Sequence, residues 1–259
     1  MVAAGMLPVS GTQVRLCEPT GEDELLVLES GGPAAATTLA LAVRLAADPA
    51  GRTIDWPALP AVDLGAAALL IRGAWLGNTI RTEALCPASG CDEPIDVAFG
   101  ISAYLDHHRP RGFRGVSEGE PGWFALTGTD VRFRIPTIGD LLEALEGPGP
   151  AATMLERCVR PPDPSAAVAR RVDRALEALA PRLDGELSGT CPACGQTVDL
   201  RFEPISYVLE ELRDASTGLF ADVHELASAY QWSEQAILAL GRRRRHGYVA
   251  MIRGEYAFV

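Results

Sequence analysis

The sequence lacks a long apolar run and an N-terminal secretory signal. Its most apolar stretch, residues 64–75, is interrupted by Arg72 and is too short to cross a bilayer. The first residues, MVAAGMLPVSG, contain neither a basic segment nor a long apolar segment that would direct secretion. These absences predict a protein without a membrane span that works in a reducing cytoplasm.

Positive charge is also scarce. The chain has 23 Lys and Arg residues against 34 Asp and Glu residues, which gives a net charge of −11. An acidic surface repels the phosphates of nucleic acids, so binding them would require a local basic patch. With 259 residues and 47% hydrophobic residues, the chain is long enough for one large domain or two modest ones, each with a buried core.

The motifs of common catalytic sites are missing. We find no Gly-rich phosphate loop after a strand, no nucleophile elbow and no His-rich metal motif. Asp96 and Asp199 are the best candidates for a carboxylate pair, but both fit an outward-facing place on a half-exposed strand. His107-His108 and His224 are interpreted as surface residues. The sequence therefore predicts a non-enzymatic protein without a small-molecule substrate.

Four of the six cysteines form two close pairs, each in a Pro/Gly turn. They are Cys86 and Cys91 in CPASGC, and Cys191 and Cys194 in CPACG. In a reducing compartment such pairs are more often metal ligands than disulfides, and two thiolate pairs satisfy tetrahedral zinc. A closed four-thiolate site leaves no position for a reacting water, so we predict one structural zinc ion. The lone Cys17 and Cys158 are interpreted as buried small side chains.

Two other arrangements of these cysteines stay open at this point. The thiols could form a metal-free cluster or disulfides. Alternatively, each pair could bind its own ion, with His107 or His108 completing the first site. The second pair has no matching histidine nearby in the sequence, which weakens that arrangement.

The chain also repeats itself. Residues 14–36 align without a gap on residues 131–153 at an offset of 117, and the identical pairs include Arg15 with Arg132 and Thr20 with Thr137. The cysteine segments then align at an offset of 103, which pairs Cys91 with Cys194, Asp96 with Asp199 and Phe99 with Phe202. Two similarities in the same order predict an internal duplication.

Each copy predicts the same order of elements. A short strand ends at a Pro-Thr pair whose threonine caps a helix, and further helices precede the cysteine turn and a closing strand. We therefore predict an α+β fold made of a duplicated α/β unit, with units at residues 1–125 and 126–215 and a helical tail at residues 216–259. The expected helices are residues 22–29, 35–47, 64–76, 140–146, 151–157 and 166–180, and the closing strands are residues 95–99 and 198–202.

The tail reads as two helices joined at Gln231-Trp232-Ser233, with Ser233 as the cap of the second. The second helix is expected to hold Ile237, Leu238 and Leu240, and a run of four arginines follows. Since residues 221–259 carry a net charge of only +1, we expect the tail to bind another protein. A helix-turn-helix that contacts DNA and a plain solvated helix end are the alternatives. Arg and aromatic residues dominate interface energies, so the predicted partner-binding residues are Trp232, Arg242, Arg243, Arg244, Arg245 and Tyr248.

Several of these segments resemble the baseplate hub and hub-assembly proteins of T4-like contractile phage tails and of related contractile injection systems. The similar segments are EPTGEDELLVLES, DLGAAALLIRGAWLGNTIRTEALC, the IDV after the first cysteine turn, and the tail LASAYQWSEQAILALGRRRRHGYVAMI. This chain departs from the family by showing the unit twice and by its C-terminal addition.

The resemblance implies a structural or assembly role in which the chain docks other baseplate or tail proteins. A zinc-ribbon, helix-turn-helix regulator that binds DNA is the competing interpretation. A metal-dependent hydrolase comes third, because it would need an open metal position that the sequence does not offer.

Overall fold

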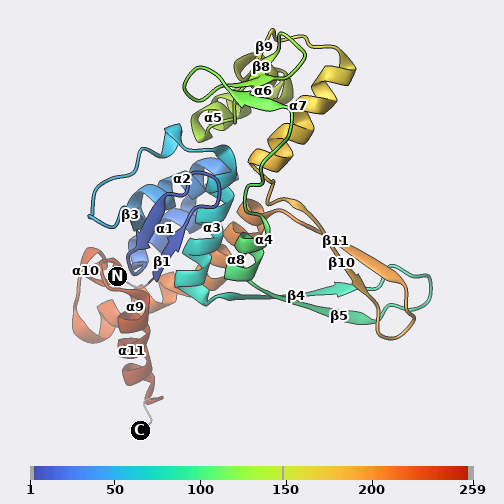
Figure 1. Cartoon of the computed structure of the whole chain (residues 1–259). Coiled ribbons are helices and arrows are strands. Elements are labelled where there is room, and N and C mark those ends of the chain that lie inside the picture. The colour runs from blue at the N-terminus through green and yellow to red at the C-terminus, as the bar shows by residue number, and fades with distance from the viewer. Residues whose placement is uncertain (1–2, 148, 256–259) are drawn as a thin grey trace.

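The computed structural model of the chain describes residues 3–147 and 149–255. The fold mixes helices and sheets, as predicted, and its elements are given below as a first half, a second half and the last three helices, called the tail (Figure 1). The first half contains β1 (Ala3–Met6), β2 (Gln13–Leu16), α1 (Gly21–Glu29), α2 (Ala34–Leu45), β3 (Ala46–Ala47), η1 (Trp56–Ala58), α3 (Ala61–Leu76), β4 (Thr79–Leu85), β5 (Pro94–Gly100) and α4 (Ile101–His107). The second half contains β6 (Val116–Glu118), β7 (Phe124–Leu126), β8 (Arg132–Phe133), α5 (Ile138–Glu146), α6 (Pro150–Cys158), β9 (Val159–Arg160), α7 (Ala166–Leu179), β10 (Gly185–Thr190), β11 (Thr197–Phe202) and α8 (Pro204–Ser216). The tail contains α9 (Leu219–Tyr230), α10 (Glu234–Leu238) and α11 (Arg242–Arg253).

The two halves place equivalent elements in the same order. In each, two antiparallel strands lead into a pair of helices, a third strand returns to the sheet, and a longer helix leads to a hairpin and a final helix. The returning strand pairs in the same register, with Arg15 opposite Ala47 in the first half and Arg132 opposite Arg160 in the second. The second half adds β6 to its sheet, which becomes four-stranded.

The two threonines predicted as helix caps occupy that position. Thr20 precedes α1 and Thr137 precedes α5, and both form capping boxes with an aspartate three residues later. The aspartates accept hydrogen bonds from the cap backbone. Each also binds an arginine in the last turn of the next helix, α2 or α6, at 2.7 Å in both halves. The caps satisfy N–H groups that the first turn of a helix leaves without partners.

Two details of the sequence prediction are wrong. The helix expected at residues 35–47 ends at Leu45, because Ala46 and Ala47 pair with β2 as the strand β3. The boundary expected between residues 125 and 126 falls inside β7, so β6 and β7 belong to the sheet of the second half. In both places, sheet pairing with a distant segment overrides the local helix pattern or composition.

The main hydrophobic core is shared by both halves. It contains Leu41, Leu64 and Leu69 from the first half together with Ile138 and Leu212 from the second. Helix α8 packs against α1, α2 and α3, so the C-terminal helix of the second half covers the helices of the first. A smaller core lies between the sheet β6–β9 and α7. The two predicted units therefore share one main interior, and the second half has a smaller core of its own.

Arg72, which interrupts the most apolar stretch of the sequence, is buried in this interior. Its guanidinium group binds both carboxylate oxygens of Glu211 on α8, at 2.8 and 3.0 Å, and also donates to the carbonyl oxygen of Thr79 at the start of β4. A buried arginine requires such partners, because an unpaired charge in the interior is strongly unfavourable. This ion pair fixes the first hairpin to α3 and α8.

Candidate metal centre

Two hairpins leave the helical core side by side and meet at their tips (Figure 1). The first consists of β4 and β5, and the second of β10 and β11. Each carries one of the predicted cysteine pairs in its turn. The left-handed backbone of Gly90 in the first turn and Gly195 in the second lets the chain reverse tightly there, a conformation that favours glycine.

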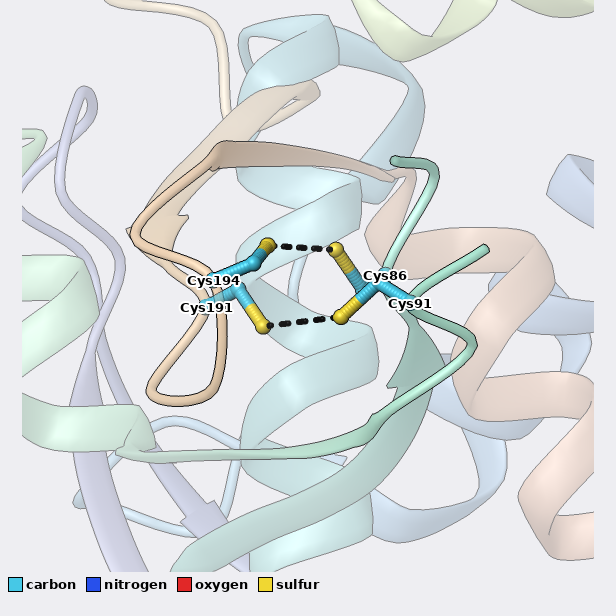
Figure 2. A group of neighbouring side chains, drawn as sticks. All are labelled: Cys86, Cys91, Cys191 and Cys194. Carbon is cyan, nitrogen blue, oxygen red and sulfur yellow. Dashed lines mark hydrogen bonds between the residues drawn. The ribbon is translucent and has the colours of Figure 1, made fainter. Parts of the chain in front are cut away.

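The four predicted cysteines lie together at the hairpin tips (Figure 2). All four sulfur atoms are within 4.8 Å of one another. The Cys86 sulfur is 3.6 Å from that of Cys194, and the Cys91 sulfur is 3.8 Å from that of Cys191. Each of these close contacts therefore joins a cysteine of one hairpin to a cysteine of the other. Within the described ranges, no other group of ligand-type side chains is this close.

The sulfur spacing fits a tetrahedral metal ion. Zinc–sulfur bonds of about 2.3 Å place tetrahedral sulfurs about 3.8 Å apart, which matches the two measured contacts. A disulfide requires a sulfur–sulfur distance of about 2.05 Å, so the thiols are not joined in that way. Neither His107 nor His108 belongs to the group, and the arrangement with two separate Cys/His sites is therefore wrong. The four cysteines could bind one metal ion.

Backbone N–H groups in the turns point at the sulfurs. The N–H groups of Cys194 and Ala193 stabilise the Cys191 thiolate and lower its pKa to about 7. For Cys86 the N–H of Ala88 acts in the same direction, but burial and the neighbouring thiols outweigh it and raise the pKa to about 12. Without a bound cation, the four thiols therefore do not all lose their protons together. A bound cation would supply the charge that four thiolates need, and its binding would release protons.

The bases of the hairpins are joined by aromatic side chains at matching positions. Phe99 and Phe202 meet edge to face with ring centroids 5.2 Å apart. Tyr104 packs on Phe99, and Tyr207 packs on Phe202, at 5.2 and 5.3 Å. The two tyrosines are 103 residues apart, the same offset as the cysteines Cys91 and Cys194. The sequence comparison missed this tyrosine pair, although the repeat offset would have revealed it.

The proposed carboxylate pair is not assembled. Asp96 and Asp199 are both exposed and lie on different hairpins, where Asp199 accepts a hydrogen bond from Ser188 across its own hairpin at 2.6 Å. The lone cysteines differ from each other: Cys158 is buried as predicted, whereas Cys17 is exposed and that prediction is wrong. Neither lies in the metal group.

Two of the four tail arginines point into the protein. Arg245 is fully buried and binds Glu24 on α1 at 2.7 and 2.8 Å and Asp222 on α9 at 3.1 Å. Arg242 is partly buried and donates to the carbonyl oxygen of Ala215. Arg245 is therefore unavailable to another molecule, and its prediction as a partner-binding residue is wrong. The acidic partners Glu24 and Asp222 were not foreseen, because they lie 221 and 23 residues away in the sequence.

The other predicted docking residues lie at the surface of the tail. Arg243 and Arg244 are exposed, and Arg244 lies over the ring of Tyr248. Tyr248 and Trp232 are half-buried and meet edge to face at 5.0 Å, with Tyr230 stacked on the indole. The expected second tail helix ends at Leu238, and Leu240 lies in the short connection to α11. Ser233 caps α10 as predicted, since its hydroxyl accepts from the N–H of Ala236.

Comparison of the chain with protein-family models, with curated proteins and with solved structures found no match. Among the helices of the described residues, none is both long and apolar enough to cross a membrane.

Proposed function

We propose that the protein is a non-enzymatic structural or assembly component of a contractile, phage-tail-like baseplate. In this role a zinc ion held by Cys86, Cys91, Cys191 and Cys194 joins two copies of an ancestral α/β unit into one rigid scaffold. The scaffold works in the cytoplasm of the producing cell and docks other baseplate or tail proteins.

One observation carries this proposal: the four thiols come in pairs from two hairpins that occupy matching places in the two halves. Thiolates that use all four positions of a tetrahedral ion leave none for a substrate or a water, which supports a structural and not a catalytic metal. The shared order of elements and the matched aromatic residues at the hairpin bases support the duplication.

The exposed side chains of the tail support a protein partner over duplex DNA. With Arg242 and Arg245 turned inward, Arg243 and Arg244 are the members of the arginine run left for phosphates, on a chain with a net charge of −11. Phosphate neutralisation needs more cations than that for tight binding. Aromatic residues beside an exposed arginine are typical of protein interfaces, and here Trp232 and Tyr248 stand beside Arg244.

The test is to delete the coding sequence from its native genome and to examine the producing cells by electron microscopy. We expect complete contractile particles to disappear, to return with the wild-type chain, and not to return with the Cys86→Ser, Cys191→Ser double variant. A Cys17→Ser variant, which changes an exposed cysteine outside the metal group, serves as the matched control and should restore the particles. Normal particles in the deletion strain would refute the assembly role.

A further inference from the structure

Two backbone hydrogen bonds join the tail to the first half, and an equivalent pair of bonds occurs in the second half. We call each such pair, with the bridge that it forms, a seam. In the first half, the N–H of Gly21 donates to Leu240 and the N–H of Arg242 donates to Pro19, both at 3.3 Å. These bonds pair Thr20 with Gly241 in an antiparallel bridge. The Pro-Thr pair that precedes α1 is thus covered by the start of α11.

In the second half the same bonds recur with another helix. The N–H of Ile138 donates to Leu59 and the N–H of Ala61 donates to Pro136, both at 2.8 Å, and Pro60 pairs with Thr137. The Pro-Thr pair that precedes α5 is thus covered by the start of α3. This second seam joins one half of the protein to the other. A seam of this type is therefore a joint between separate units.

Helix α11 is the counterpart of α3 in other respects as well. The residues before both helices, Pro60 and Gly241, have nearly the same backbone angles, and neither forms a side-chain cap. The sequence Ile-Arg-Gly follows that residue at the same distance in both places, within α3 and at the end of α11. The arginine of each, Arg72 and Arg253, binds both carboxylate oxygens of a glutamate on the helix packed beside it, Glu211 and Glu225.

The two seams differ at one matched pair of positions, four residues after the bridge. In the seam between the halves, these positions are Leu64 and Leu141, which belong to the same apolar core. In the tail seam they are Arg245 and Glu24, which form the fully buried ion pair. A buried carboxylate is strongly destabilised beside an apolar side chain. The tail seam, which contains Glu24, therefore binds a helix with an arginine at this position and discriminates against a helix without one.

The tail is also an almost independent piece of structure. Leu226, Ile237 and Val249 form a small core of their own, separate from the main one. Only Thr217 and Gly218 connect α9 to α8. Both residues already have right-handed helical backbone angles, so α8 and α9 could join into one continuous helix with a small change. Such a helix would carry the tail away from its own body.

From these features we infer that the tail is an exchangeable arm, and that two copies of this chain associate by placing their α11 helices on each other's first half. The partner is a second copy because the seam requires an arginine at the position of Arg245, and the chain carries that residue itself. When two chains exchange their tails, every contact of the tail seam forms again between the two molecules. Such a dimer costs little free energy because no contact of the seam is lost.

The first test measures the mass of the zinc-loaded protein in solution over a range of concentrations by light scattering. We expect a shift from the mass of one chain to that of two chains as concentration rises. Gly218→Ala should strengthen the dimer, because alanine favours the regular helical angles of a continuous helix over the ψ of −5° that Gly218 has in the single chain, and the added methyl group meets no atom within 4 Å. Wild-type protein and Gly218→Ala protein that both remain single chains at every concentration would overturn the inference.

A mixing experiment then identifies the surface. Glu24→Leu leaves the tail arginine facing an apolar residue, and Arg245→Leu leaves Glu24 without a cation, so each variant alone should lose the dimer. In a mixture, one arm restores the native Arg245–Glu24 pair and the other places leucine against leucine, as Leu64 and Leu141 already do in the seam between the halves. We therefore expect a dimer of one variant with the other.

Two results would contradict this mechanism. One is a mixture that stays as single chains while hydrogen exchange shows that α9–α11 are folded. The other is a dimer that each variant forms alone, because it would place the contact on a different surface. The variant that carries both leucines is the control for folding: it should behave like the wild type if the seam tolerates the apolar pair.

Discussion

Replacing Cys86 and Cys191 by serine removes one sulfur from each hairpin tip and leaves two thiols, which cannot close a tetrahedral site. The hairpins have little else to hold them at that end. Most of their residues are exposed or half-buried, and Ile80, Val198 and Phe202 are the buried side chains outside the cysteines. A two-stranded hairpin is marginally stable without such support.

The size of the effect follows from the length of chain that the metal closes. With the core folded, that loop runs only from the hairpin bases to the cysteines, through residues 79–86 and 185–191. A cross-link that closes a loop of about 15 residues is worth about 3 kcal/mol in the chain-entropy model, or roughly a hundredfold in the equilibrium between closed and open hairpins. The main core contains neither cysteine pair, so we expect the loss to stay within the hairpins.

Native-state hydrogen exchange measures this directly. Amides of β4, β5, β10 and β11 should lose about two orders of magnitude of protection in the double variant or in chelator, whereas amides of α3 should keep theirs. The Cys17→Ser variant is the control, since that cysteine is exposed and outside the cluster. If the hairpin amides stay protected in chelator, a metal ion does not hold the hairpins together. If the α3 amides lose as much protection as the hairpin amides, the effect of metal loss is not confined to the hairpins.

Three further predictions concern the ion pairs and caps. Arg245→Leu should destabilise the tail by about 3–5 kcal/mol because it leaves Glu24 buried and charged. Adding Glu24→Leu should recover the part of that loss due to Glu24 but not the part due to Asp222, which also loses its bond to Arg245. Urea unfolding followed by tryptophan fluorescence compares the two variants. Burial favours the protonated form of Asp140, but Arg134, the Thr137 N–H and Arg157 outweigh it and hold the pKa well below the ordinary value of 3.8. The ionised Asp140 therefore stabilises the fold above pH 3.8, and this stabilisation is lost as the pH falls below that value. The thermal unfolding temperature of Asp140→Asn should depend less on acid than that of the wild type. Thr137→Ala should cost about 1 kcal/mol, measured by the same thermal method, because it removes the α5 cap.

Local features of the sequence were enough to predict several parts of the structure. Each threonine of a Pro-Thr pair has an aspartate three residues later, and this local chemistry determines where α1 and α5 begin. The cysteine site could also be predicted, because short spacing brings both thiols of each pair to one turn and four thiolates complete one ion. Both inferences depend on residues close together in the sequence.

Contacts between distant residues could not be predicted in the same way. Nothing near Arg245 indicates that its partner is Glu24, 221 residues earlier, and nothing near Arg72 indicates Glu211. Without those partners, both arginines look like solvated residues. The strand β3 is similar: Ala46 and Ala47 continue a helical pattern, and their pairing with β2 depends on the tertiary fold.

The tail seam also has a consequence for the order in which the protein is made. Synthesis runs from the N-terminus, so Pro19, Thr20 and Glu24 leave the ribosome long before the residues of α11 that cover them. Until the start of α11 emerges, the carbonyl group of Pro19, the N–H group of Gly21 and the carboxylate of Glu24 lack these partners. Burial of that carboxylate must wait for nearly the whole chain, which makes the closing of the seam a late event in folding.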